Sequence, residues 1–391
     1  MKENLRDVLK TNVLTGDGAM GTYLYQLGFP VGISYEEMNL TKPQVIADVH
    51  RRYYEAGARF IETNTFSANR EKLSKYGLEN EVEAINRSGV KIAREAVGED
   101  AYVFGAVGSI RGGIRKSITQ AELERDFQEQ IEILLDAAVD GLLLETFYDL
   151  EEMLIALNIV RRLSDLPVVC QFAVEDIGRT QDGYDVTEAF LQVQAAGGDI
   201  VGFNCRSGPN AILRTMEQMR PVDLPISVFP NAGIPDYVDG KVTYMASPQY
   251  FADNAVKFAS QGARIIGGCC GTTPEHIRAI AEALKSFSVA ASPASARESQ
   301  GDRPGESIRL TLAYKKNVPV ENPPEKTAEL TLVDLVRRRH TVIVELDPPR
   351  SLDIGNFLAG AQVLKEAGAD AVTMADNSLA VNRMSHFALG T

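Results

Sequence analysis

The sequence predicts an α/β protein, with a (β/α)8 TIM barrel in residues 1–287, a linker, and a truncated βαβ start of a second barrel. Two observations predict the first barrel. From residue 12 to residue 287, short apolar runs alternate with longer amphipathic stretches, which is typical of βα units repeated around a parallel sheet. Eight such units can be counted in about 280 residues, close to the ~250 residues of a typical eight-fold barrel.

Each expected strand is an apolar run too short for a helix and followed by a helical pattern. Helices are expected, for example, over residues 121–138 after the third strand and 274–287 after the eighth. The eight expected strands are residues 13–15, 59–63, 102–106, 141–145, 167–173, 199–203, 225–229 and 264–267.

The amino-acid composition of the chain changes after residue 287. Residues 288–328 are small, polar and rich in proline, which predicts a linker. In residues 329–391 the patterns predict one βαβ unit. A second barrel would need ~200 residues or more, so we expect this tail to be only the start of one. Its elements are expected at residues 330–339 (helix), 341–346 (strand), 354–367 (helix) and 371–375 (strand).

Composition narrows the class of function. The chain has 391 residues, a net charge of −13 and a pI near 5.0, which argues against nucleic acid as a partner. The first residues lack the apolar core of a signal peptide, and no apolar run approaches the roughly 18 residues that span a membrane. Four cysteines make a poor disulfide framework for this length. We therefore expect a cytoplasmic protein that acts on small molecules, with no membrane partner.

Three of the four cysteines suggest a metal site. Cys269 and Cys270 are adjacent in a glycine-rich turn after the eighth expected strand, and Cys205 follows the sixth. Barrels of this class place their chemistry at the carboxyl ends of the strands, so the three thiols are expected on one face. Three sulfurs with one open position are typical of a catalytic Zn²⁺ site. Cys170 lies inside the fifth strand, and we expect it to be a core thiol.

Other strand ends carry polar residues whose roles the pattern leaves open. Asp17 can fix a glycine-rich turn or face a ligand, and Glu145 can cap the following helix or face a ligand. Asn64 and Thr65 can line the pocket or only shape a loop. The glycine-rich segment after the first strand lacks the Lys-Ser/Thr of a phosphate-binding loop. None of the histidines, His50, His276, His340 and His386, closes a barrel strand, which disfavours a hydrolytic zinc barrel with histidine ligands.

Five motifs lie in order along the first region of the chain: Gly-Asp-Gly-Ala-Met-Gly-Thr at 16–22, Glu-Thr-Asn-Thr-Phe at 62–66, Gly-Phe-Asn-Cys at 202–205, Pro-Asn-Ala-Gly at 230–233 and Gly-Gly-Cys-Cys-Gly-Thr-Thr-Pro-Glu-His at 267–276. Together they resemble the homocysteine S-methyltransferase family, which includes the homocysteine module of cobalamin-dependent methionine synthase. The resemblance implies that Cys205, Cys269 and Cys270 hold Zn²⁺. It also implies that Asp17 and Glu145 hold the amino group of homocysteine, that main-chain N–H groups near Ala19 and Met20 meet its carboxylate, and that Asn231 fills the fourth zinc position when substrate is absent.

The tail contains two further motifs, Val-Glu-Leu-Asp-Pro-Pro-Arg at 344–350 and Asp-Ala-Val-Thr-Met-Ala-Asp-Asn at 370–377. They resemble a different family, the methylenetetrahydrofolate reductases. The order of the two regions is that of bacterial proteins that fuse both enzymes. The resemblance implies that Glu345 stands at the position of a general acid. Since the flavin-binding remainder of such a reductase is missing, we expect no reductase activity.

The expected chemistry is methyl transfer to the thiol of homocysteine, which forms methionine. A free thiol has a pKa of about 8.5 and is mostly protonated at neutral pH, whereas a thiol coordinated to Zn²⁺ is deprotonated. Two carboxylates can hold the ammonium of an amino acid, so Asp17 and Glu145 need not act as acid or base. The methyl donor stays open among S-methylmethionine, S-adenosylmethionine, methylcobalamin and methyltetrahydrofolate. The alternative is a non-catalytic zinc-binding fragment of a larger bifunctional methyltransferase/reductase.

Overall fold

The computed structural model describes residues 2–112, 118–174, 178–238, 241–289, 339, 341–345 and 355–373. The chain divides into two compact units, Met1–Gly301 and Asp302–Thr391. The expected linker falls almost entirely outside the described residues, as does the expected helix at 330–339 apart from residue 339; His340 and His386 also lie outside them. Among the described residues, no helix has both the length and the apolar content that crossing a bilayer requires.

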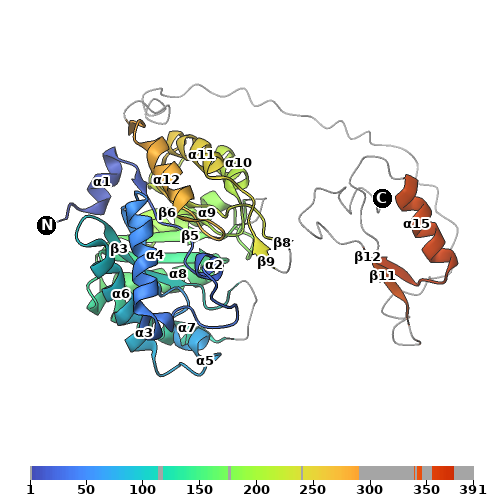
Figure 1. The fold of residues 1–391 in the computed structure, drawn as a ribbon, viewed down its shortest axis with the longest axis horizontal. Helices are drawn as coiled ribbons and strands as arrows, with labels where there is room; N and C mark the ends of the chain where they lie inside the picture. Colours follow the sequence, from blue (N-terminus) through green and yellow to red (C-terminus); the bar gives the residue numbers. More distant parts are fainter. Residues whose placement is uncertain are drawn as a thin grey trace. The chain divides into compact units, whose positions relative to one another are not determined.

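The first unit is a (β/α)8 barrel, as predicted. All eight expected strands are present in one parallel sheet, ordered β1-β10-β7-β6-β5-β4-β3-β2, with helices outside it (Figure 1). The two ends of this sheet meet, because the Arg59 N–H donates to the Thr15 carbonyl at 2.8 Å and the Asp17 N–H to Phe60 at 3.0 Å. The strands are β1 Leu14–Thr15, β2 Phe60–Glu62, β3 Tyr102–Gly108, β4 Gly141–Phe147, β5 Val168–Phe172, β6 Ile200–Asn204, β7 Ile226–Phe229 and β10 Ala263–Ile266.

The helices of the barrel begin with local signals that the sequence carries. Thr119 and Glu122 form a capping box at α7, and Asp149 caps α8 through the Glu152 N–H. The expected helix at 121–138 ends early, because Ala138 adopts a left-handed conformation with φ 62°. The helices are α1 Leu5–Thr11, α2 Gly21–Gln26, α3 Met38–Thr41, α4 Pro43–Glu55, α5 Arg70–Ser74, α6 Val82–Val97, α7 Gln120–Asp136, α8 Leu150–Leu163, α9 Val186–Ala195, α10 Pro209–Gln218, α11 Pro248–Ser260 and α12 Pro274–Leu284.

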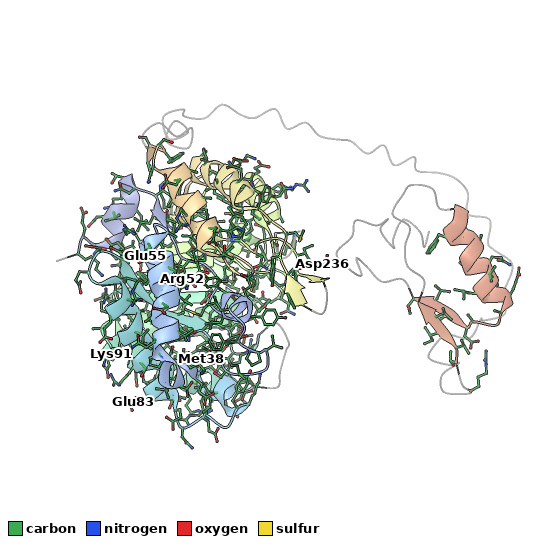
Figure 2. The ribbon with its side chains drawn as sticks, in the orientation of Figure 1. Met38, Arg52, Glu55, Glu83, Lys91 and Asp236 are labelled. Atoms are coloured by element: carbon green, nitrogen blue, oxygen red, sulfur yellow. The ribbon has the colours of Figure 1, made fainter. Side chains whose placement is uncertain are left out.

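The outer helices are amphipathic, as their patterns require. On α4 and α6, charged side chains such as Arg52, Glu55, Glu83 and Lys91 are exposed on the outer surface (Figure 2), whereas their apolar faces pack inward. This arrangement buries the apolar layer between helices and sheet and gives the barrel most of its hydrophobic stabilisation.

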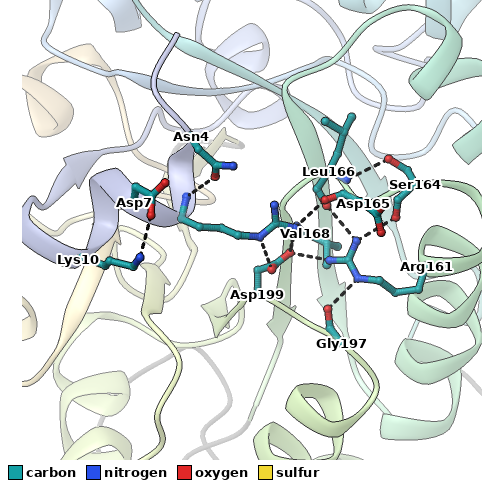
Figure 3. Close-up of polar contacts among 11 residues, drawn as sticks. Asn4, Asp7, Lys10, Arg161, Ser164, Asp165, Leu166, Val168, Gly197 and Asp199 are labelled. Carbon is teal, nitrogen blue, oxygen red and sulfur yellow. Dashed lines mark hydrogen bonds and ion pairs between the residues drawn. The ribbon is translucent and has the colours of Figure 1, made fainter.

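The amino-terminal end of the barrel is closed by α1, an element that the sequence pattern did not predict. Leu5 and Leu9 are 1% exposed and pack on the lower interior layer of the barrel, which includes Phe60 and Phe104. A polar network fixes α1 at this end (Figure 3): Asp199 accepts from Arg6 Nε at 2.5 Å and from Arg161 Nη2 at 2.5 Å. The barrel is therefore a filled core whose open end lies at the carboxyl ends of the strands.

A short hairpin, β8 Asp236–Val238 and β9 Lys241–Thr243, follows β7 and was also not predicted. The second unit contains the expected βαβ elements: β11 Ile343–Glu345, α15 Gly355–Glu366 and β12 Ala371–Thr373, with β11 and β12 paired in parallel.

Candidate metal centre

The three cysteines that the sequence singled out lie together at the open end of the barrel. The sulfur atoms of Cys205, Cys269 and Cys270 all lie within 4.8 Å of one another, and those of Cys205 and Cys270 are 3.8 Å apart. Cys205 directly follows β6, and the pair follows β10. All three are free thiols.

Strand β7 explains why thiols distant in sequence meet, because it lies between β6 and β10 in the sheet. The Cys205 N–H donates to the Phe229 carbonyl at 3.1 Å, and the Cys269 N–H to Pro230 at 2.8 Å. The Cys270 carbonyl accepts from the Ala232 N–H at 2.8 Å. The segment after β7 therefore holds the main chain of all three cysteines.

The sulfur geometry fits Zn²⁺. With Zn–S bonds of about 2.3 Å in a tetrahedron, two sulfur ligands lie about 3.8 Å apart, the spacing of Cys205 and Cys270. Cys205 and Arg206 both adopt left-handed conformations, with φ of 57° and 54°. Such conformations are costly for residues other than glycine, and they turn the chain sharply at the end of β6.

Hydrogen bonds between the thiols shift their pKa values in opposite directions. The thiols of Cys269 and Cys270 stabilise a thiolate on Cys205 and lower its pKa well below the usual value. The same interaction raises the pKa of Cys269 well above its usual value and that of Cys270 to about 12. The three thiols therefore favour Cys205 as the site of a thiolate, and three thiolates around one Zn²⁺ would carry a net charge of −1.

Tyr244, which follows the β8–β9 hairpin, lies against the cysteine turn and was missed by the sequence reasoning. Burial, followed by the charges of Cys270, Cys205 and Cys269, raises the pKa of its hydroxyl. A Cβ on Gly271 would lie 2.1 Å from the Cγ atom of Tyr244, and Gly271 has φ 80°. The glycine after the cysteine pair is therefore required both by the backbone conformation and by the close approach of the ring.

Three carboxylates lie on the same face of the barrel. Asp17 follows β1, Glu62 ends β2 and Glu145 lies in β4. Asp17 Oδ2 accepts from the Glu62 N–H at 3.0 Å, whereas Oδ1 is buried without a hydrogen-bond partner among the described residues. Glu145 Oε2 accepts from Asn204 Nδ2 at 3.2 Å. The sequence reasoning missed Glu62 and Asn204, although each is the last residue of a barrel strand.

Burial and mutual repulsion destabilise the ionised forms of these three carboxylates. Burial is the main cause that raises the pKa of Asp17 and of Glu62 well above their usual values, and for Glu62 the charges of Glu145 and Asp17 add to it. Burial, followed by the charges of Asp17 and Cys205, raises the pKa of Glu145 to about 8. A cation placed among these carboxylates would favour their ionised forms.

The remaining expected site residues have specific surroundings. The Asn231 side chain hydrogen-bonds to the Cys205 sulfur, and its Oδ1 is buried without a partner among the described residues. The Ala19 N–H donates to Thr272 Oγ1 at 3.0 Å, so it is not free to meet a substrate carboxylate. Met20, the residue before α2, is the other expected main-chain donor.

Several open alternatives are decided by hydrogen bonds. Glu145 does not cap α8, because Asp149 does so. Asn64 and Thr65 shape the loop after β2: Asn64 Nδ2 donates to the Tyr35 carbonyl at 2.8 Å, and Thr65 Oγ1 to Ala106 at 2.8 Å. Cys170 is fully buried in β5, as expected for a core thiol.

The described histidines serve the scaffold. His50 is fully buried in α4. His276, in α12, accepts from the Thr273 N–H through Nδ1 at 3.2 Å, and its Nε2 lies 2.9 Å from the Ala246 carbonyl.

Comparisons with known proteins agree with this geometry. The family model described as homocysteine S-methyltransferase matches residues 14–284. Methionine synthases of Mycobacterium tuberculosis and Mycobacterium leprae are each 33% identical over 301 residues, which cover 72% of this chain but only 25% of those proteins. The chain thus spans about a quarter of the length of these curated relatives.

A solved structure supports the fold and the family. The homocysteine methyltransferase MmuM from Escherichia coli, in its metallated form, is 25% identical and superimposes with a TM-score of 0.61 over 71% of this chain and 99% of MmuM. The cysteine motifs, the barrel and the matched region extend over the same residues. The chain belongs to the homocysteine S-methyltransferase family.

Proposed function

We propose that this protein catalyses the zinc-dependent transfer of a methyl group to the thiol of homocysteine, which yields methionine. The observation that carries the proposal is the convergence of three cysteine sulfurs, with two of them 3.8 Å apart as a tetrahedral Zn²⁺ site requires. In this proposal Cys205, Cys269 and Cys270 hold the metal. Asn231, whose side chain lies beside the Cys205 sulfur, fills the fourth position when substrate is absent.

The carboxylates give the site its preference for an amino acid. Asp17 and Glu145 are 3% and 7% exposed, and Asp17 Oδ1 has no partner among the described residues. A substrate ammonium would supply both the missing hydrogen bonds and the opposing charge. We assign the substrate carboxylate to the Met20 N–H, since that of Ala19 donates to Thr272. The amino-acid end and the sulfur of the substrate are then held at two fixed points.

The methyl transfer itself needs few protein groups. Bound Zn²⁺ would supply a deprotonated substrate sulfur at neutral pH. The substrate sulfur forms a bond to the methyl carbon while the bond from that carbon to the donor breaks, and the electron pair of the broken bond leaves with the donor. The proton of the thiol is lost when homocysteine binds. Asp17 and Glu145 orient the substrate so that its sulfur faces the open end of the barrel, where the donor enters.

Zinc analysis combined with a donor panel tests the proposal. The wild-type protein is expected to retain about one zinc and to form methionine from homocysteine with at least one of S-methylmethionine, S-adenosylmethionine, methylcobalamin or methyltetrahydrofolate. Cys205→Ala should lose both zinc and turnover. Cys170→Ala is the control, because this thiol is fully buried within β5 and does not belong to the sulfur cluster. Zinc binding without turnover for any donor would favour the non-catalytic alternative.

We also propose that the protein works in a reducing compartment such as the cytoplasm, because three neighbouring thiols must stay reduced to bind zinc. In this proposal the second unit is similar to part of a methylenetetrahydrofolate reductase, and its described strands β11 and β12 pair in parallel. We expect no reductase activity; NAD(P)H oxidation by the purified chain with added flavin would contradict this.

A further inference from the structure

Strand β4 contains an irregularity next to Glu145. Leu144 pairs with Cys170 of β5, but the next paired residue, Phe147, faces Phe172, so β4 has one residue more than β5 over this stretch. Thr146 lies in this bulge with φ 58°. A bulge leaves a main-chain group without its ladder partner and re-aims the neighbouring side chain, which here is that of Glu145.

Asn204, the last residue of β6, compensates for the bulge from two strands away. Its Oδ1 accepts from the Thr146 N–H at 2.8 Å. Its Nδ2 donates to Thr146 Oγ1 at 2.6 Å and to Glu145 Oε2 at 3.2 Å. Asn204 is 1% exposed, so both ends of its amide are committed to β4. One side chain therefore satisfies the bulge and fixes the Glu145 carboxylate.

Asn204 also precedes Cys205 directly, and this adjacency connects two parts of the site. The main chain of Cys205 is anchored to β7 through the Phe229 carbonyl. The position of Glu145 relative to Cys205 is thus fixed by the buried side-chain amide of Asn204 and by the peptide bond that joins Asn204 to Cys205. No flexible segment intervenes, because β4 and β6 both belong to the barrel sheet.

We infer that Asn204 is a positioning residue that sets the spacing between the sulfur-binding and ammonium-binding points and thereby selects the chain length of the thiol amino acid. The inference rests on the proposed function. Homocysteine is one methylene longer than cysteine. A site whose two points are held rigidly accommodates only one of these lengths, whereas a carboxylate that is free to move can follow the shorter substrate.

Calorimetric titration of the zinc-loaded protein with homocysteine and with cysteine tests the inference. Wild type should prefer homocysteine by about tenfold or more, the usual value of one methylene. In Asn204→Ala, homocysteine affinity should fall by about tenfold and the preference over cysteine should largely disappear. Asn86→Ala is the matched control: Asn86 is also fully buried and donates to main-chain carbonyls, but within α6. It should keep the wild-type preference.

Asn204→Asp keeps the experiment informative if the alanine variant does not fold. The aspartate retains an acceptor for the Thr146 N–H but places an oxygen beside Glu145 Oε2, so it should displace that carboxylate and reduce the preference in the same way. Zinc content measured on each variant separates metal loss from altered selectivity. A merely structural role would lower the active fraction without changing the ratio of the two affinities. An unchanged ratio in zinc-loaded variants would overturn the inference, whereas a wild-type protein that does not bind homocysteine would overturn the proposed function instead.

Discussion

Glu145→Gln tests the electrostatics of the site most directly. Burial raises the pKa of Glu145 to about 8, whereas its usual value is 4.5. At pH values between these two pKa values, Glu145 is protonated in the folded protein but ionised in the unfolded chain. Because the native state holds more protons in this window, its stability must fall as the pH rises through it. Glutamine has the same shape and can still accept from Asn204, but it cannot ionise.

The expected size of the effect follows from the linkage relation. With a pKa of 4.5 in the unfolded chain and about 8 in the folded protein, ionisation of Glu145 should cost about 3 kcal/mol between about pH 5.5 and about pH 8.5. Wild type should lose about that much more free energy of unfolding over this range than Glu145→Gln does. Asp17 and Glu62 remain in both proteins, and the charge of Glu145 raises the pKa of Glu62, so the difference between the two curves reports Glu145 together with its interaction with Glu62.

Denaturant unfolding of the zinc-loaded protein without homocysteine, measured at several pH values, provides the assay. Three thiolates around one Zn²⁺ would carry a net charge of −1, so the zinc-loaded site should still present a negative charge to Glu145. Saturating homocysteine should reduce the pH dependence of wild type, because an ammonium beside Glu145 favours its ionised form. Parallel pH profiles for wild type and Glu145→Gln would refute the reasoning.

Three further changes probe other parts of the structure. Asp17→Asn should raise the dissociation constant of homocysteine by about tenfold or more in calorimetry, since it removes a charged acceptor for the ammonium, and an unchanged constant would exclude Asp17 from the site. Gly271→Ala should lower the free energy of unfolding by more than about 2 kcal/mol, because φ is 80° and the new Cβ meets Tyr244. Gly28→Ala is the control: its φ is 99° with open space around it, so it should lower the free energy of unfolding by only about 1 kcal/mol. Equal losses in the two variants would contradict the close contact with Tyr244. Leu9→Ala should cost about 2–5 kcal/mol by opening a cavity under the barrel without altering zinc content, and loss of zinc would show that α1 affects the metal site.

The barrel and the clustering of the three cysteines could be predicted because their signals are local. Each strand is a short apolar run, and each helix has its own cap or period, so the expected strands differ from the observed ones only at their ends. The closing residues of parallel strands share one face, which places Cys205 near Cys269 and Cys270 without any knowledge of side-chain packing. The floor formed by α1 was not predictable in this way, because its role depends on the open end that the closed sheet leaves beneath it.

Sequence alone determined the βα repeat and the end of the barrel at which the three cysteines meet, since these depend on residue type and on position along a strand. Tertiary structure decided the rest. Asn204, which compensates for the bulge at Thr146, lies 58 positions from it in the sequence. Tyr244 and Gly271, which lie against each other, are 27 positions apart. Such pairings arise only when the sheet closes and fixes the register of its strands, and no local pattern records that register.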